Sequence, residues 1–348
     1  GSRGLGDVYK RQGIIIIVSG HCYHGGMELA YNWFPPYSYN LALFVFISGY
    51  FYKTDYEENV GKYIWKRTKR LLIPAYLWNI FYGCMVAFLG LFGFTIGAKP
   101  DLYNLFVMPF VDGEAFQYNL GSWFVYPLFL VCIINVLFRK FLKLIHLDNE
   151  FIVLIVYLAI GMIGINTALE NPTAINGIVK LLVRTMFFLP CYEFGRFYKA
   201  VLEKKDTLNN VAYFAIIFAV QLILLTFCKD LEYTPSSFTK FNNGFIIPYI
   251  SSITAIAFWL RVSRLLVPAI GNSKLVRLIA DNTYGIMVNQ LVGFMCLKFV
   301  FYGLSRITSG SLFGDFNVAS FKSSIWYYYL PNGLQQLSLI HISEPTRP

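Results

Sequence analysis

The sequence predicts an all-α integral membrane protein, a polytopic bundle of about ten transmembrane helices. Of its 348 residues, 56% are hydrophobic and only 14% are charged, and the mean hydropathy is +0.53. A soluble domain carries about a quarter charged residues, so this composition is typical of a chain that lies mostly in lipid. The length of the apolar runs and the charges of the loops between them indicate the same fold class.

Apolar runs long enough to cross a bilayer recur along the whole chain. An α-helix needs about 20 such residues to span roughly 30 Å of hydrocarbon. The candidate spans cover residues 13–26, 37–52, 71–95, 122–138, 151–168, 178–197, 211–228, 244–260 and 283–304, and a last one begins near Ser324. No low-complexity linker separates them, so we expect a single domain over residues 13–336.

Local signals refine two of these boundaries. Pro74 lies just inside the third span, where a proline bends the helix or marks its true start. Asp281 precedes the stretch "NTYG" at the start of the ninth span. We interpret it as a helix N-terminal residue, because a carboxylate there accepts hydrogen bonds from free backbone N–H groups.

Lysines and arginines gather in alternate loops. One set of loops holds Lys53, Lys62, Lys66, Arg67, Lys69, Arg70, Arg139, Lys140, Lys143, Lys199, Lys204, Lys205, Arg261, Arg264, Lys274 and Arg277. The other set holds only Lys99, Lys229, Lys240, Arg306 and Lys322, with Lys180 at a boundary. Because positively charged loops stay in the cytoplasm, we expect the first set, and the N-terminus with it, on that side. The net charge of +10 is then an orientation signal, and no nucleic-acid partner is expected.

Both ends of the chain differ in character from the apolar sequence beside them. The segments "GDVYKRQ" and "LSLIHISEPTRP" resemble translated sequencing-adapter sequence. We therefore expect residues 1–12 and 337–348 to be non-native, and the natural protein to be truncated at both ends.

The longest outer loop, residues 96–121, leads into the next span through the acidic and aromatic stretch "MPFVDGEAFQYNLGSW". Long ordered loops are often functional. Two interpretations stay open: a plain surface loop, or a lid that binds an acceptor over the outer mouth of the bundle.

Few residues in the spans are suited to chemistry. His21 and His24 lie three apart, with Glu28 as the only nearby carboxylate, and the six cysteines show no metal spacing. No metal is therefore expected. His21 follows an unbroken apolar run and the small pair Ser19–Gly20. Burial keeps a histidine neutral and able to act as a general base. A histidine that only hydrogen-bonds a neighbouring helix is the alternative.

The basic stretch "KYIWKRTKRLLIPAY" at residues 62–76 enters the third span. Arg67 and Arg70 lie three apart on one helical face, and Lys69 lies between them. Such residues anchor a helix to anionic lipid. Arg67 and Arg70 are also suited to binding the phosphates of a nucleotide-like ligand.

Arg184 lies inside the sixth span with no carboxylate one turn away. An arginine in the membrane must face a partner or a watery cavity, so Arg184 is a candidate site residue. Glu193, near the end of the same span, is expected to pair with Arg196.

Six short stretches stand in the same order as the motifs of a known family. They are "GIIIIVSGH" (13–21), "SYNLALFVFISGYFY" (38–52), "KRLLIPAY" (69–76), "GSWFVYPLFL" (121–130), "FFLPCYEFGRFYK" (187–199) and "NTYGIMVNQ" (282–290). Together they resemble membrane acyltransferase family 3, and most closely its fucose O-acetylase-like or exopolysaccharide acyltransferase branch. Each match is short, and their common order over nearly the whole chain carries the resemblance.

The resemblance implies a multi-pass O-acyltransferase of the bacterial cytoplasmic membrane. Such an enzyme moves an acyl group, usually acetyl, from cytoplasmic acyl-CoA to a hydroxyl of a cell-surface or lipid-linked sugar. It also implies that His21 is the essential histidine of the first helix. The chain departs from the family at Asn40 and Asn289, which stand where many members have a histidine. An amide hydrogen-bonds but does not act as a base at neutral pH.

On this basis we expect His21 to take the proton from the acceptor hydroxyl as that hydroxyl attacks the thioester. Candidates for the oxyanion and acceptor pocket are Asn40, Ser122, Trp123 and Arg184. Candidates for binding the phosphates of acyl-CoA, here the co-substrate, are Arg67, Arg70 and Lys69. No tightly bound cofactor and no metal are expected.

A second function stays open, that of a non-enzymatic translocator of polysaccharide or lipid-linked sugar. The branch contains members assigned such roles. A translocator needs an aromatic and polar lining but no dedicated base. Membrane lipid is a partner under either function.

Overall fold

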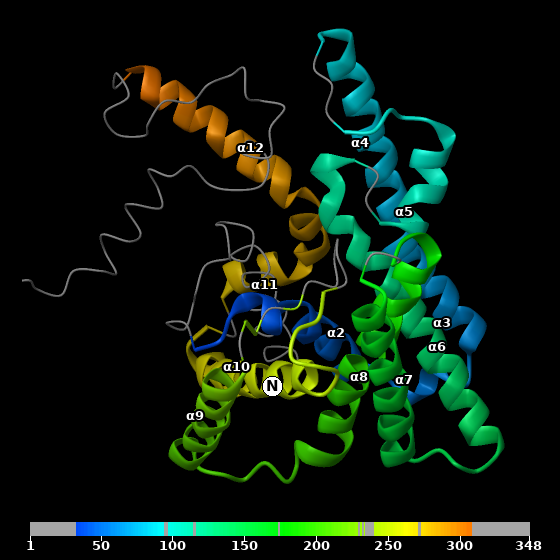
Figure 1. Cartoon of the computed structure of the whole chain (residues 1–348), viewed down its shortest axis with the longest axis vertical. Helices are drawn as coiled ribbons and strands as arrows, with labels where there is room; N and C mark the ends of the chain where they lie inside the picture. The colour runs from blue at the N-terminus through cyan, green and yellow to red at the C-terminus, as the bar shows by residue number, and fades with distance from the viewer. Residues whose placement is uncertain are drawn as a thin grey trace, which may run out of the picture.

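The computed structural model describes residues 33–93, 97–113, 116–172, 175–228, 230–231, 233, 240–270 and 273–307. Every regular element within these ranges is a helix (Figure 1). The all-α fold class predicted from the sequence is thus confirmed. The predicted spans at residues 13–26 and beyond Ser324 lie outside the described residues, as do His21 and His24.

The longer helices are, in chain order, α2 (Asn40–Tyr50), α3 (Val60–Arg67), α4 (Ile73–Leu91), α6 (Val125–Leu144), α7 (Glu150–Glu170), α8 (Gly177–Phe197), α9 (Asn210–Phe227), α10 (Ile247–Ile270), α11 (Lys274–Asp281) and α12 (Thr283–Ile307). Short helical segments join them: η1 (Pro36–Ser38), η2 (Thr54–Tyr56), η3 (Thr68–Leu72), η4 (Tyr103–Val107), α5 (Met108–Val111), η5 (Gln117–Phe124) and η6 (Tyr198–Leu202).

Five helical stretches of the described residues are long and apolar enough to cross a membrane. They are Val60–Leu91, Gln117–Leu144, Glu150–Glu170, Asn210–Phe227 and Ile247–Ala269. Two shorter apolar helices, Asn40–Tyr50 and Thr283–Leu297, lie at predicted spans as well. The chain is therefore a polytopic membrane protein, because several separate helices have the required length and composition.

The predicted spans and the observed helices differ mainly at their ends. The span predicted over residues 244–260 continues to Ile270. The interpretation of Asp281 as a helix N-terminal residue is wrong: it is the last residue of α11, and α12 begins two residues later at Thr283. A carboxylate at a junction between two helices satisfies the same local pattern, so the sequence signal did not distinguish the two positions.

The basic stretch and the third span form one continuous helical run, from α3 through η3 to α4. The central segment η3 is a π-helix, and Pro74 occupies the first turn of α4 directly after it. Proline has no N–H for the carbonyl one turn earlier, and a π segment relieves that mismatch. Pro74 thus marks the start of α4, one of the two outcomes predicted for it.

The central helix of the bundle is α8, which contacts α2, α6 and α7. It carries four charged side chains that are all at least nine-tenths buried: Lys180, Arg184, Glu193 and Arg196. These charges explain why α8, although 21 residues long, is not among the five apolar stretches. Charged side chains inside a membrane bundle face protein partners rather than lipid.

Two glycines let α2 and α8 cross in close contact. A Cβ atom on Gly49 would collide with the backbone carbonyl of Tyr192, and one on Gly195 would collide with that of Phe46. Small residues at such a crossing allow the two backbones to approach each other. The crossing fixes α2 in place, and α2 separates the two cavities described below.

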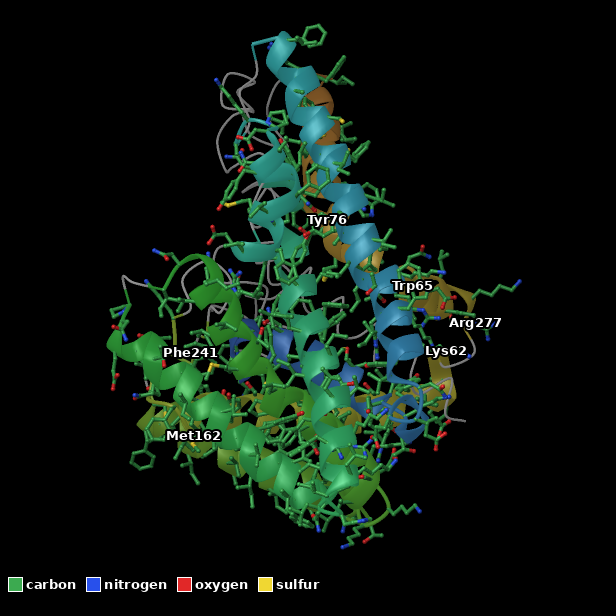
Figure 2. The ribbon with its side chains drawn as sticks, turned by 90° about the vertical axis from the view of Figure 1, so that its right-hand side faces the viewer. Lys62, Trp65, Tyr76, Met162, Phe241 and Arg277 are labelled. Carbon is green, nitrogen blue, oxygen red and sulfur yellow. The ribbon has the colours of Figure 1, made fainter. Side chains whose placement is uncertain are left out.

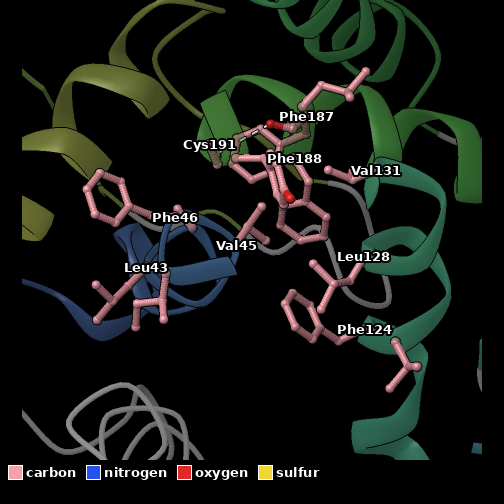
Figure 3. Close-up of a cluster of buried hydrophobic side chains, with 14 of the residues drawn as sticks. Leu43, Val45, Phe46, Phe124, Leu128, Val131, Phe187, Phe188 and Cys191 are labelled. Carbon is pink, nitrogen blue, oxygen red and sulfur yellow. Dashed lines mark hydrogen bonds between the residues drawn. The ribbon is translucent and has the colours of Figure 1, made fainter. Parts of the chain in front are cut away.

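Apolar side chains from α2, η5–α6 and α8 meet in one buried cluster (Figure 3). The rings of Phe124 and Phe188 lie edge to face with centres 5.5 Å apart. Phe44 contacts Phe124 in the same way at 6.2 Å. This packing holds η5, which carries the predicted residues Ser122 and Trp123, against α2 and α8.

The connections at one end of the bundle lie close together. Lys143 of α6 pairs with Glu57 in the connection after α2, at 2.9 Å. Arg196 of α8 pairs with Glu150 of α7 at 2.8 Å. We call this the basic end, because the connections after α2 and α6 that meet here belong to the lysine- and arginine-rich set of loops. At the opposite end, α4 and α12 project from the bundle (Figure 1).

Candidate functional site

A cavity of about 510 Å³ lies between α2, α3–η3, η5–α6 and α11–α12. Its volume is within the range of small-molecule sites, roughly 300–1,000 Å³. Figure 2 shows the molecule from the side on which α3 and α4 carry Lys62, Trp65 and Tyr76. We call this space the cationic cavity, for the reason that follows.

Among the residues that the structure describes, four cations line the cavity and face a single carboxylate. The cations are Lys53, Lys66, Arg67 and Arg70, and the carboxylate is that of Asp281. None of the four forms an ion pair within the part of the chain that the structure describes. Such an excess of positive charge draws an anion into the cavity.

The helix geometry brings Arg67 and Arg70 to the same cavity but turns Lys69 away. Residues three apart share a helical face, whereas adjacent ones do not. The Lys69 ammonium lies 4.9 Å from the centre of the Trp65 ring, and Lys69 is not among the residues that line the cavity. Of the three predicted phosphate ligands, the structure brings two together.

Three tyrosines form the wall behind these cations. The rings of Tyr56 and Tyr63 are stacked with centres 4.5 Å apart, and Tyr52 meets both edge to face. The Arg67 Nε donates a hydrogen bond to the Tyr63 hydroxyl at 3.0 Å. Arg67 is therefore a half-buried guanidinium whose hydrogen-bond partner is a neutral phenol rather than a carboxylate.

The Tyr52 hydroxyl links the tyrosine wall to the connection after α2. The hydroxyl donates a hydrogen bond to Glu57 Oε1 at 3.2 Å. This bond ties the connection after α2 to the wall, and so helps to position Tyr56.

The interior of the cavity is apolar. Phe44 and Ile47 of α2, Phe124 and Leu128 of η5–α6, and Met287 of α12 line it. The cavity thus combines a cationic part with a hydrocarbon part. This combination fits an elongated ligand that has phosphates at one end and a flexible, uncharged arm at the other.

Two predicted pocket residues, Trp123 and Arg184, lie in contact just beyond this apolar interior. The Arg184 guanidinium is 4.5 Å from the centre of the Trp123 ring, and its Nη1 donates to the backbone carbonyl of Asp112 at 2.9 Å. Ser122 is adjacent and buried, and its hydroxyl donates to the Asn119 carbonyl at 2.9 Å. Phe124 connects this group with the cationic cavity, because it lines that cavity and follows Trp123 directly.

Asn40 lies in a different place. It is the first residue of α2, is 4% exposed, and accepts a hydrogen bond from the Leu41 backbone N–H at 2.7 Å. It lines a narrow space with Phe187, Tyr233 and Ser252, apart from the cationic cavity. The structure therefore groups Ser122, Trp123 and Arg184, and leaves Asn40 outside that group.

The described part of the outer loop is packed against the bundle. The Asp112 carboxylate accepts from the Gly177 N–H at 2.9 Å, which ties the loop to α8. Asn79 Nδ2 donates to the backbone carbonyls of Asn104 and Leu105 at 3.1 and 2.8 Å, which ties it to α4. Gly113 has φ +80°, and a Cβ there would collide with Trp123. Such anchoring is compatible with both predicted interpretations of this loop.

Sequence reasoning missed a buried group of amides where α4, η5 and α12 meet. Asn119 Nδ2 donates to Asn79 Oδ1 at 3.2 Å, and the Tyr82 hydroxyl donates to Asn289 Oδ1 at 2.7 Å. Asn79 and Asn119 are 1% and 2% exposed. The signal was visible, because an amide inside an apolar run such as "AYLWNIFYG" needs a partner.

A second group of charges at the basic end is paired throughout. Arg139 Nη2 contacts both carboxylate oxygens of Glu193 at 2.8 Å and Glu150 Oε2 at 2.7 Å. Arg196 donates to Glu150 Oε1 at 2.8 Å. The predicted pairing of Glu193 with Arg196 is therefore wrong. Both side chains instead reach partners on the neighbouring helices α6 and α7.

No group of three or more histidine, cysteine, aspartate or glutamate side chains able to hold a metal ion exists among the described residues. His21, the predicted base, and His24 lie outside them.

The chain matches one known family. A family model described as an acyltransferase domain matches residues 12–329, which is nearly the whole chain. No curated protein and no solved structure matches significantly.

Proposed function

Because the chain belongs to membrane acyltransferase family 3, we propose that it transfers an acyl group, acetyl in the first instance, from acyl-CoA to a sugar hydroxyl. The acceptor is a cell-surface or lipid-linked glycan, and the membrane is the bacterial cytoplasmic membrane. The enzyme is an acyltransferase of the class that transfers groups other than amino-acyl groups. The cationic cavity is the observation that carries the choice of donor.

The chemistry of acyl-CoA matches the two parts of that cavity. Its nucleotide end carries a diphosphate and a further phosphate, and its pantetheine arm is uncharged and ends in the thioester. Lys53, Lys66, Arg67 and Arg70 supply the positive charge for the phosphates. The apolar residues of α2, η5–α6 and α12 surround the arm. Lys69, which lies over Trp65, serves as an interfacial anchor in this arrangement.

The basic end faces the cytoplasm in this proposal. Positively charged loops are retained on the cytoplasmic side of a membrane, and acyl-CoA is available there. The apolar interior then leads the thioester from the cytoplasmic side toward the middle of the bundle, where Ser122, Trp123 and Arg184 lie beyond Phe124.

His21 is the general base of the reaction. It accepts the proton of the acceptor hydroxyl as the hydroxyl oxygen attacks the thioester carbonyl. A new C–O bond forms, the C–S bond breaks, and the thiolate of coenzyme A takes up a proton as it leaves. Hydrogen-bond donors near the carbonyl stabilise the oxyanion, and Arg184 with the neighbouring Trp123 and Ser122 are the candidates. Asn40 remains a candidate for contact with the acceptor.

Transfer of label from acetyl-CoA tests the proposal. Membranes that contain the protein are incubated with radiolabelled acetyl-CoA and cell-envelope glycan, and label in the glycan is counted. We expect His21→Ala to abolish transfer, because the base is lost, and the matched variant His24→Ala to retain most of it. Equal transfer by the two variants would exclude His21 as the base. If folded wild-type protein transfers no label from several acyl-CoA donors, the translocator function would be favoured instead.

A further inference from the structure

A second cavity, of about 460 Å³, lies on the other side of α2. It is bounded by α7, α8–η6, α9 and α10, and its volume again falls in the range of roughly 300–1,000 Å³ seen for ligand sites. Figure 1 shows α9 beside α10, with the connection from η6 running below them. Phe46 of α2 lines this cavity, whereas Phe44, Ile47 and Ser48 line the cationic cavity. The two cavities therefore have α2 as a common wall and do not share a lining residue.

Hydrocarbon forms nearly all of the lining. Phe194, Ile253 and Leu260 are typical of it, and the polar tips of the two tyrosines are already engaged. The Tyr213 hydroxyl donates to the Ala257 carbonyl at 3.0 Å, and the Tyr198 hydroxyl donates to Asp206 Oδ2 at 3.1 Å. Below the rim, the lining side chains that the structure describes therefore offer an occupant almost only hydrocarbon.

Of the two charged side chains at the rim of the cavity, one forms ion pairs within the described chain and the other does not. Among the described residues, Lys205 and Asp206 are the only charged ones that line the cavity. Asp206 pairs with Arg261 through Oδ1, and with Arg264 through Oδ2 at 2.9 Å. Lys205 is exposed and forms no ion pair in the part of the chain that the structure describes. The rim thus presents one ammonium group to an anion.

We infer that this cavity binds one acyl chain of an anionic phospholipid from the leaflet at the basic end, with the headgroup phosphate against Lys205. An acyl chain has no hydrogen-bonding group to lose in an apolar cavity, whereas a peptide would bring backbone N–H and C=O groups that stay unsatisfied there. Basic residues between transmembrane helices at the cytoplasmic leaflet are suited to anionic headgroups. The bound chain fills the space between α8 and α9.

This site is independent of the proposed transfer reaction. The acyl-CoA arm lies on the opposite face of α2 in our proposal, and lipid binding is measured without any turnover. If the acyltransferase assay fails, the lipid-binding inference is unaffected. If the lipid-binding test fails, the proposed acyl-CoA site is unaffected.

Photo-crosslinking of lipid tests the inference. The full chain is reconstituted in phosphatidylcholine vesicles that contain a small share of phosphatidylglycerol with a photoactivatable group on one acyl chain. After irradiation, labelled peptides are mapped by mass spectrometry. We expect labelling of residues 194–205 and 253–260 well above that of the exposed side chains of α4, such as Leu77 and Phe81.

Four variants make the test specific. Ala257→Phe fills the cavity and Leu202→Trp narrows its rim, so both should remove the label from these peptides while α4 keeps its own. Leu202 is 44% exposed, so its variant is expected to fold even if Ala257→Phe does not. Lys205→Gln should lower the preference for the phosphatidylglycerol probe over a phosphatidylcholine probe by about fivefold. Lys204→Gln, one residue away and outside the lining, should not.

Two results would overturn the inference. One is labelling at the cavity that is no stronger than on α4 and that neither Ala257→Phe nor Leu202→Trp changes. Lipid that only surrounds the protein would give this result. The other is equal labelling by the two lipid probes with no effect of Lys205→Gln, because the anionic headgroup is part of the claim.

Discussion

Two groups of arginines lie near the basic end, and they differ in what they face. Arg139 and Arg196 face carboxylates: Glu193 and Glu150 approach them within 2.8 Å. Arg67 and Arg70 line the cationic cavity and form no ion pair with a carboxylate in the described chain. The same residue type is thus paired within the protein in one region and left to an outside partner in the other.

The difference separates a structural role from a binding role. A charge removed from water is costly unless it is paired, so a buried arginine with internal carboxylates helps to hold helices together. An arginine beside a cavity without such partners is stabilised by an anionic ligand instead. The two regions therefore make opposite predictions for stability and for donor binding.

The largest expected effect is on stability, from Arg139→Met. This change leaves the Glu193 carboxylate, which is 0% exposed, without its main partner. Breaking a buried ion pair costs about 3–5 kcal/mol, so we expect a large fall in the thermal unfolding temperature in detergent. Lys140→Met, at the exposed neighbouring position, is the control and should change little. Equal unfolding temperatures for the two variants would show that the ionic group does not hold α6, α7 and α8 together.

The second prediction concerns Arg67, where we expect a large effect on donor binding and a small one on stability. We expect Arg67→Gln to raise KM for acetyl-CoA by about 10- to 150-fold, because a charge-assisted hydrogen bond contributes about 1.5–3 kcal/mol. The unfolding temperature should fall much less than for Arg139→Met, because the guanidinium loses a hydrogen bond to a neutral phenol and no carboxylate partner. Steady-state kinetics and thermal unfolding of the same preparation measure both quantities. A variant that unfolds like Arg139→Met would place Arg67 in the structural group.

The sequence predicts features that depend on neighbouring residues better than features that depend on contacts between distant parts of the chain. Helix type and most span positions follow from local apolar runs, so α7, α8 and α9 begin and end within two residues of prediction. Arg139 was assigned to a loop by its charge alone, because its partner Glu193 is 54 residues away. Only the packing of α6 on α8 shows that this arginine is buried.

The candidate site shows the same limit. The helical spacing of Arg67 and Arg70 predicted a common face, and both line one cavity. Lys53 and Asp281 belong to the same cavity, yet they come from segments more than 200 residues apart, so spacing alone does not connect them. An amide in an apolar run signals that Asn79 needs a partner, but the sequence does not show that this partner is Asn119, 40 residues away. The role of His21 stays a prediction from the resemblance.

A smaller effect distinguishes the two neighbours Arg70 and Lys69. Arg70 lines the cavity, whereas Lys69 lies over the Trp65 ring. Arg70→Gln should raise KM for acetyl-CoA by about five- to tenfold, less than Arg67→Gln because Arg70 is exposed and its charge is screened. Lys69→Gln removes the same charge one residue away and should leave KM nearly unchanged. Equal effects of the two variants would mean that general basicity, not the cavity, attracts the donor.

The smallest effect, and the only one of opposite sign, is expected at Asp281. Its carboxylate is the one negative charge that lines the cationic cavity in the described chain, so it repels the phosphates of the donor. Asp281→Asn should therefore lower KM for acetyl-CoA by about two- to fivefold at low salt, and the gain should shrink as salt screens the charge. Asp101→Asn, an exposed carboxylate outside the cavity, is the matched control and should have no effect. If Asp281→Asn instead raises KM, the carboxylate contributes to binding, as an acceptor for a donor group of the ligand. The cavity would then bind acyl-CoA through hydrogen bonds to its uncharged groups as well as through the charge of its phosphates.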